Sequence, residues 1–122
     1  MSARLLLSIE NSMRHDIAAV AAEYVLECFR LNTSPRVDEL ARKLQVHPSF
    51  LSRHFKTSTG RRLSAALKEH QIAEAKRLLS HTSMTIDQIA AQAGFGTRNT
   101  FYRYFKRVVG TTPQRYRAKS CK

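Results

Sequence analysis

The sequence is poor in the residues that build metal centres and disulfide frameworks. Its 122 residues include two cysteines, five histidines and no tryptophan. Cys28 stands in a helical apolar pattern and Cys121 near the C-terminal end, so they form no CxxC pair, and the histidines are scattered away from cysteines and carboxylates. We therefore expect no metal site, no other cofactor and a reducing, cytoplasmic environment.

Long apolar runs and catalytic constellations are missing too. No hydrophobic stretch approaches the roughly 20 residues that cross a bilayer, and Leu5–Leu7 is cut short by Glu10, too soon for a signal peptide. The sequence has no glycine-rich phosphate loop, no paired nucleophile and base, and no carboxylate pair on a shared face. These absences argue against a membrane-spanning protein, an enzyme and a small-molecule ligand.

Acidic residues are scarce. The chain has 9 Asp+Glu against 21 Lys+Arg, which gives a formal net charge of +12. After Asp87 no acidic residue follows, whereas cations accumulate: Arg98, Arg103, Lys106, Arg107, Arg115, Arg117, Lys119 and Lys122. Because a basic surface attracts polyanions, the first candidate partners are nucleic acid and an anionic membrane surface.

The 4 glycines and 3 prolines stand mostly between segments with helical periodicity. Apolar residues recur there at three- and four-residue steps, which predicts an all-α fold of about seven helices. The expected helices cover approximately residues 13–29, 35–44, 48–60, 62–79, 86–93, 97–109 and 112–116.

Local signals mark several helix ends. Ser34 is expected to cap the second helix, with Pro35 in its first turn. Thr85 and Gln88 have the spacing of a capping box, and Gly110 can end the helix before it in the left-handed conformation. The inner face of the third helix is expected to carry Phe50, Leu51, His54 and Phe55.

One basic, amphipathic phrase occurs twice. "LSRHFKTSTG" at 51–60 and "FYRYFKRVVG" at 101–110 agree at Arg53/Arg103, Phe55/Phe105, Lys56/Lys106 and Gly60/Gly110. Upstream, at an offset of 49 residues, the matching pairs are Val37/Ile86, Asp38/Asp87, Leu40/Ile89 and Ala41/Ala90. Each copy is a short helix, a turn and a longer basic helix, which is the pattern of a helix-turn-helix.

The longer helix of each copy has two faces. Leu51 and Phe55, like Phe101 and Phe105, are expected to point into the core. The opposite faces are expected to carry Ser49, Ser52, Arg53 and Lys56, and Arg98, Asn99, Tyr102, Arg103 and Lys106. Such a helix fits the major groove of DNA, where arginine can bind guanine and asparagine can bind adenine.

Residues 37–117 resemble the DNA-binding domain of the AraC/XylS family of bacterial transcription regulators. The resemblance is most specific at Gly94-Phe95, Phe101, Phe105-Lys106, Gly110, Thr112-Pro113 and Tyr116-Arg117. In the first copy it rests on Leu40-Ala41, Leu51, Arg53, Phe55-Lys56 and Gly60. It implies two homeodomain-like helix-turn-helix subdomains joined by a long helix, with recognition helices at about 48–57 and 97–107 in successive major-groove segments.

Carried over by position, the resemblance also implies the contacts with DNA. Base contacts would come from Ser49, Ser52 and Arg53, and from Arg98, Asn99, Thr100, Tyr102 and Arg103. Independently of the resemblance, phosphate contacts are expected from Lys56, Lys106 and Arg107. Two departures weaken the first copy: Gln45 stands where a glycine is common, and His47 where a serine cap is usual. With the short Ser49 and Ser52, they predict that the first module reads fewer bases than the second.

The expected organisation is an N-terminal extension (1–12), a first subdomain (13–61), a linker helix (62–80), a second subdomain (81–118) and a basic tail (119–122). We expect a transcription regulator, most often an activator in this family, in the bacterial cytoplasm at the nucleoid, with double-stranded DNA as partner and RNA polymerase as a further candidate. It is either a small stand-alone regulator or the C-terminal domain of a larger one. Two alternatives stay open: a sequence-indifferent basic nucleic-acid binder and an anionic-membrane-surface protein.

Overall fold

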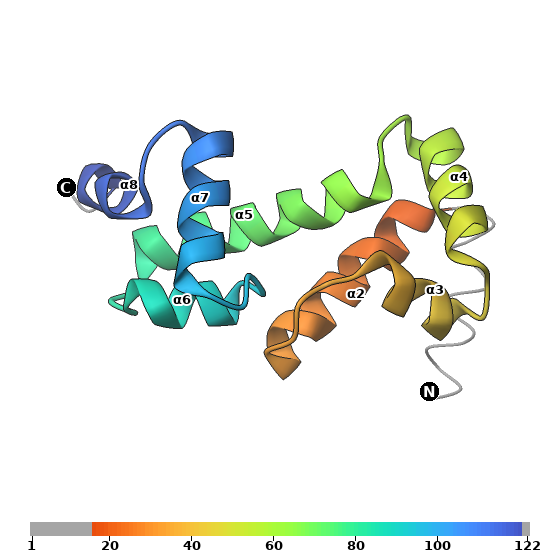
Figure 1. Cartoon of the computed structure of the whole chain (residues 1–122), viewed down its shortest axis with the longest axis horizontal. Coiled ribbons are helices and arrows are strands. Elements are labelled where there is room, and N and C mark those ends of the chain that lie inside the picture. Colours follow the sequence, from red (N-terminus) through yellow and green to blue (C-terminus); the bar gives the residue numbers. More distant parts are fainter. Residues whose placement is uncertain (1–15, 121–122) are drawn as a thin grey trace. The chain divides into compact units, whose positions relative to one another are not determined.

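The computed structural model describes residues 16–120, and these form seven α-helices and no strand (Figure 1). The all-α prediction is therefore confirmed. The helices are α2 (Ile17–Leu31), α3 (Val37–Leu44), α4 (Pro48–Thr59), α5 (Leu63–His81), α6 (Ile86–Gln92), α7 (Arg98–Val109) and α8 (Pro113–Ser120). Met13, the expected start of the first helix, and Cys121 lie outside the described residues.

The described chain divides into two compact units. One contains residues 16–27 and 35–68, and the other contains residues 28–34 and 69–120. Each unit thus holds one copy of the repeat: α3 and α4 in the first, α6 and α7 in the second. None of the helices between residues 16 and 120 is long and apolar enough to cross a membrane.

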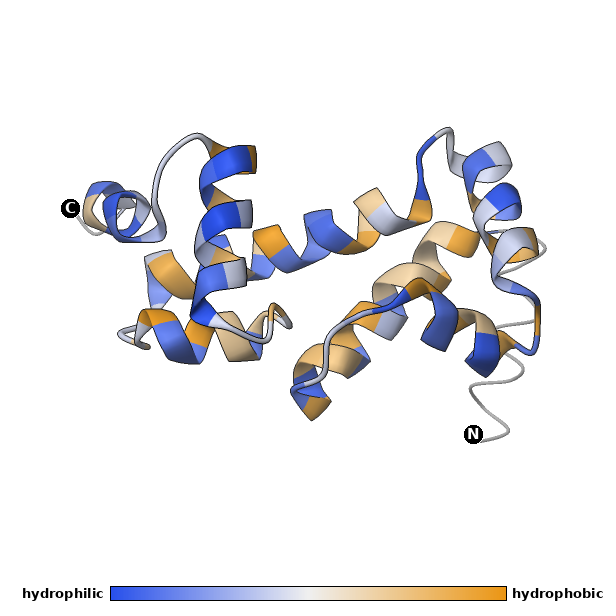
Figure 2. Cartoon of the chain, in the orientation of Figure 1, coloured by the Kyte–Doolittle hydropathy of each residue, from blue (hydrophilic) through white to orange (hydrophobic). Residues whose placement is uncertain are grey.

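In the first unit, α2 supplies an apolar surface and one polar anchor. Most of this helix is coloured as hydrophobic in Figure 2, and its side chains Ile17, Val20, Ala21 and Val25 are buried. The hydroxyl of Tyr24 accepts a hydrogen bond from the backbone N–H of Arg36 at 2.9 Å and donates to the Glu39 carboxylate at 2.7 Å. This hydroxyl therefore fixes the start of α3 on α2.

The predicted cap at Ser34 is wrong, because α3 begins two residues later than expected. Its N-terminal flanking residue is Arg36, which is extended (φ −140°, ψ 139°) and makes no side-chain cap. The bond between Arg36 and Tyr24 keeps the backbone extended there, so Pro35 lies before the helix and is buried. Asp38 and Glu39 in the first turn complement the positive end of the helix dipole instead.

The second unit has one contiguous hydrophobic core, built on α5, α6 and α7. Its buried members are Ile72, Ala75, Leu78, Leu79, Ile89, Ala90, Ala93, Phe95, Phe101 and Phe105. The predicted capping box starts α6: the Thr85 hydroxyl accepts from the Gln88 N–H at 3.1 Å, and the Gln88 side chain accepts from the Thr85 N–H at 2.9 Å. A capping box satisfies two backbone donors that the helix itself leaves unpaired.

A buried glutamine joins α5 to the turn between α6 and α7. The Gln71 side chain is 1% exposed, and its Nε2 donates to the carbonyls of Ala93 at 3.1 Å and Gly94 at 2.9 Å. Its Oε1 atom has no hydrogen-bond partner among residues 16–120. The amide thus holds the turn, where Gly94 has φ +81°, against α5.

Replacing Gln71 by methionine keeps the length of this side chain and removes both donors. We expect the free energy of unfolding to fall by about 1–2 kcal/mol, since each buried hydrogen bond contributes about 0.5–1.5 kcal/mol and the unpartnered oxygen is removed too. Urea denaturation measures the change. Gln114→Met, at an exposed position of α8, is the matched control, and equal midpoints for the two variants would contradict the role of Gln71.

Candidate nucleic-acid interface

The two copies of the repeat present their side chains in the same way. Along 51–60 and 101–110, every one of the ten paired positions has the same degree of burial. Leu51 and Phe101 are buried, as are Phe55 and Phe105, whereas the paired arginines Arg53 and Arg103 are exposed. The predicted burial of Leu51, Phe55, Phe101 and Phe105 is therefore confirmed. The same faces of α4 and α7 remain open.

Aromatic packing and two caps position α7. The Thr97 hydroxyl accepts from the Thr100 N–H at 3.1 Å, and Gly110 ends the helix in the left-handed conformation with φ +92°. The ring centres of Phe101 and Phe105 lie 5.5 Å apart, and the two rings are arranged edge to face. The ring of Phe95, in the preceding turn, packs on Phe101 with 5.1 Å between ring centres. The ring of Tyr116, on α8, packs on Phe105 with 5.6 Å between ring centres. Because its inner side is held from both directions, α7 has a defined orientation in its unit.

The helix α4 is positioned by a different set of groups. Gln45 is left-handed, with φ 59° and ψ 41°, so this turn does adopt the conformation that favours glycine. His47 caps the helix: its Nδ1 accepts from the Ser49 N–H at 3.1 Å. Gly60 ends α4 with φ +77°, as Gly110 ends α7. Gln45 and His47, which differ from the residues common at these positions, therefore still form the turn and the cap of a complete helix-turn-helix.

One predicted inner side chain of α4 points outward. Phe50 is 46% exposed and His54 is half-buried, so only Leu51 and Phe55 of the four expected residues are buried. The prediction for Phe50 is wrong because α4 is covered along a narrow stripe. Phe50 is turned about 100° from Leu51 on the helix, which takes it off that stripe.

The structure gathers the predicted DNA-contacting residues on two helices. Ser49, Arg53 and Lys56 are exposed on α4, and Arg98, Asn99, Thr100, Arg103, Lys106 and Arg107 are exposed on α7. Ser52 and Tyr102 occupy equivalent positions and are both half-buried. Neither helix contains an acidic residue, so each open face is basic.

Several of these cations have weak intramolecular partners. The Arg98 Nε lies 3.8 Å from the Asp87 carboxylate, with both side chains largely exposed, and the Arg53 Nε donates to the Ser49 carbonyl at 3.4 Å. The guanidinium of Arg107 lies 5.1 Å from the centre of the Tyr104 ring. Exposed contacts of this kind are worth little, so a phosphate or base can replace them.

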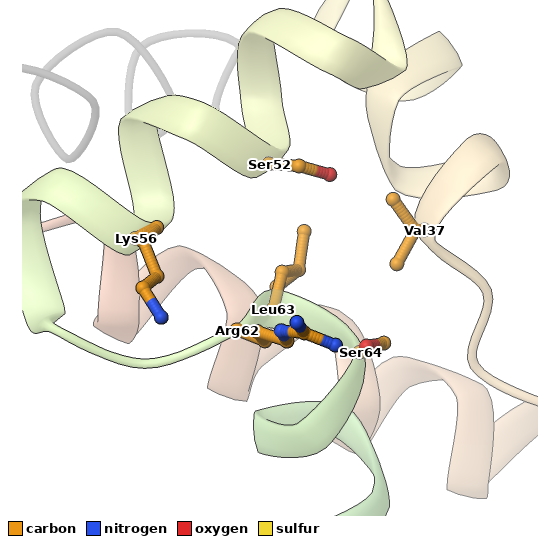
Figure 3. A pocket seen from close by; sticks show the side chains of 6 residues that line it. All are labelled: Val37, Ser52, Lys56, Arg62, Leu63 and Ser64. Atoms are coloured by element: carbon orange, nitrogen blue, oxygen red, sulfur yellow. The ribbon is translucent and has the colours of Figure 1, made fainter.

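Ser52 faces a small pocket beside α4. The pocket has a volume of about 230 Å³ and is lined by Val37, Ser52, Lys56, Arg62, Leu63 and Ser64. Figure 3 shows these side chains coming from α3, from α4, from Arg62 just before α5 and from the first residues of α5. Two cations and two hydroxyl groups therefore line one pocket at the edge of the open face of α4.

Sequence reasoning misses two residues here. Arg62 lines the pocket beside Lys56, but no motif marks it, because it stands outside both copies of the ten-residue phrase. Phe50 is expected in the core from periodicity, although its partner in the repeat, Thr100, is expected on the DNA-facing side. Because the two positions are equivalent in the repeat, the expected exposure of Thr100 could have predicted that Phe50 is exposed too.

The ionisation of two side chains outside α4 and α7 is shifted. Partial burial lowers the pKa of Lys68 on α5, and a hydrogen bond with Glu74 raises the pKa of Arg77. Between residues 16 and 120, no three His, Cys, Asp or Glu side chains are placed to hold a metal ion together.

Two basic helices, each preceded by a short helix and a tight turn, define this chain as a double helix-turn-helix protein. The sequence profile of the helix-turn-helix domain matches residues 40–119, and the chain belongs to the AraC-type helix-turn-helix family. One relative is the transcriptional activator RhaR of Enterobacter sp. (strain 638). It is 33% identical over 92 residues, which are 75% of this chain and 33% of that protein. The chain thus spans about a third of the length of RhaR.

Two solved structures extend the comparison to the fold. The C-terminal domain of AraT, a response regulator from Geobacillus stearothermophilus, has a TM-score of 0.78 at 29% identity and covers 87% of both chains. The DNA-binding domain of the global transcriptional factor AdpA, solved in complex with a target DNA, has a TM-score of 0.70 at 27% identity. That match covers 81% of this chain and 90% of the other.

Proposed function

We propose that the chain is the sequence-specific, double-stranded DNA-binding part of a transcription regulator, with α4 and α7 as its recognition helices. One observation carries the proposal: the two helices share the same burial at ten paired positions, and both leave a basic face open. A single module would need a second copy of the chain to contact two groove segments. A repeated module provides both contacts in one chain.

The proposed contacts divide into two classes. Ser49, Ser52 and Arg53 on α4, and Arg98, Asn99, Thr100, Tyr102 and Arg103 on α7, would contact base edges. Lys56, Lys106 and Arg107 would contact phosphates, and Arg62 joins this group because it lines the pocket of Lys56. Phosphate contacts position the protein on the duplex, whereas base contacts select the sequence. Ser52 and Tyr102 are equally buried, so it is the shorter side chain of Ser52 that supports a smaller share of base reading by the first module.

For the whole protein we propose activation of transcription at promoter or operator DNA, with RNA polymerase as a second partner. The name of RhaR as a transcriptional activator supports this role. On this proposal the regulator acts at the nucleoid in the bacterial cytoplasm. Residues 13–61 and 81–118 would form its two subdomains, joined by a linker helix at 62–80, although residues 28–34 belong to the second compact unit. The family consists of transcription regulators, not enzymes.

Selection from a pool of random duplexes tests this function. We expect enrichment of an asymmetric motif with two contact blocks about one helical turn, or roughly 10 base pairs, apart. Arg53→Ala should remove the base preference at a position in one block only, and Arg103→Ala should remove it at a position in the other block. The two variants are matched controls for each other, because both remove an exposed arginine at the same position of the repeat.

The alternatives predict different outcomes. A sequence-indifferent nucleic-acid binder would enrich no motif, although it would bind every duplex with the same steep dependence on salt. A membrane-surface protein would bind anionic vesicles more tightly than duplex DNA at equal ionic strength. Either result would overturn the proposed function.

A further inference from the structure

We propose that Phe50 reads sequence, and that its ring contacts the 5-methyl group of a thymine in the major groove. The inference rests on the proposed function and adds a base-reading residue to it. Phe50 is one of four large hydrophobic side chains that are exposed in the described part of the chain, together with Leu26, Leu31 and Val108. Among these four, Phe50 alone stands in the first turns of a proposed recognition helix.

The position of Phe50 on α4 favours contact with bases. It is the third residue of the helix, and the first turns of a recognition helix lie closest to the base edges. Arg53 follows three residues later, so the two side chains are neighbours on the helix surface. Because they are neighbours, Phe50 belongs to the same open face as Arg53. Val108, by contrast, is near the C-terminal end of α7.

The repeat supplies an independent argument. Phe50 pairs with Thr100 at the offset of 50 residues, and both side chains are exposed in the first turn of their helix. Thr100 is among the proposed base contacts of α7. A threonine methyl group and a phenylalanine ring are both side-chain groups that make apolar contacts with the thymine methyl. The two modules thus carry compatible chemistry at one matched position.

His54 lies beside the Phe50 ring and restricts the directions in which it can turn. The imidazole lies parallel to the Phe50 ring, with 6.0 Å between the ring centres, one helical turn further along α4. The Phe50 side chain is still 46% exposed beside this neighbour. A side chain that is ordered before binding loses less conformational entropy on contact with a ligand.

The chemistry of the ring selects the base. A phenyl group neither donates nor accepts an ordinary hydrogen bond, so it leaves the polar edges of guanine, cytosine and adenine without a partner. Thymine presents a methyl group in the major groove, and this group distinguishes it there. An exposed aromatic ring on the same helix as Arg53 and Lys56 is therefore suited to a thymine within a phosphate-lined groove.

Removal of single thymine methyl groups tests the proposal. The duplex selected by the wild-type chain is resynthesised with deoxyuridine at each thymine in turn, and the affinity of the full chain is measured at fixed salt. We expect one deoxyuridine within the block assigned to α4 to weaken binding about fourfold, the effect of burying one methyl group. Phe50→Ala should show no such penalty at that base, while Phe50→Leu should retain part of it.

The control is Leu26→Ala, which removes a side chain that is 64% exposed on α2; it should keep the full deoxyuridine penalty. Circular dichroism establishes that each variant is folded. If Phe50→Ala kept the wild-type penalty at every thymine, Phe50 would not read thymine, although the proposed function would stand. The same conclusion would follow if Phe50→Ala bound every duplex with the affinity of the wild type but no longer bound a protein that the wild type binds. If the wild-type chain selects no motif, both the inference and the proposed function fail.

Discussion

Replacing Phe105 by alanine is expected to lower the free energy of unfolding by about 3–5 kcal/mol, the usual cost of removing a buried phenylalanine. The Phe105 ring is fully buried and contacts the rings of Phe101 and Tyr116. Its loss leaves a cavity between α7 and α8 that the surrounding side chains cannot fill without moving. Since a small domain is stable by only about 5–15 kcal/mol, a large part of the population should unfold at moderate temperature. Chemical denaturation followed by circular dichroism measures the change.

The matched control for this prediction lies in the same chain. Phe50→Ala removes the same side chain from an exposed position of α4, so its effect on stability should stay below about 1 kcal/mol. The difference between the two variants isolates burial from residue type. Equal destabilisation by both substitutions would show that Phe105 does not contribute through the core of the second unit.

Replacing Arg103 by alanine is expected to reduce the preference for the cognate duplex by about 1–3 kcal/mol, or roughly 5- to 150-fold. Arg103 is exposed at the middle of the basic face of α7, so its removal leaves the core and the stability unchanged. The side chain can donate two hydrogen bonds to a guanine, and a wrong base leaves these donors without partners. Competition between cognate and scrambled duplexes at constant salt measures the preference.

Lys106→Ala is the control that separates recognition of bases from electrostatic binding to the phosphates. This exposed lysine is one turn further along α7, and its removal should weaken all duplexes alike and lower the salt dependence by about one ion. If Arg103→Ala behaved in the same way, with the cognate preference untouched, Arg103 would be a phosphate contact and not a base contact.

The sequence predicts the helices and their ends where a local signal decides the structure. The capping box at Thr85 forms, and Gly110 ends α7 in the left-handed conformation. Both depend on contacts within a few residues. The repeat also predicts the buried positions of α4 and α7, because two copies of one pattern constrain each other more strongly than one.

The errors and omissions have a different origin. Ser34 does not cap α3 because the Tyr24 hydroxyl, twelve residues away from Arg36, holds that backbone extended. Gln71 carries no local signal, since its role depends on carbonyl groups 22 and 23 residues further along the chain. Such contacts exist only once the helices are packed. Periodicity alone cannot reveal them, and it does not give the width of the covered stripe that leaves Phe50 exposed.

The equal burial of α4 and α7 has a consequence for how such a protein can change over time. The side chains that hold each helix and those that face outward are different residues: of the ten paired positions, only the first and the fifth are buried. Substitution of an outward residue leaves the core intact, so recognition can drift while stability stays constant. After duplication of an ancestral module, the two copies could therefore diverge in what they recognise while keeping a common scaffold. Ser52 and Tyr102, or Phe50 and Thr100, would be traces of that divergence.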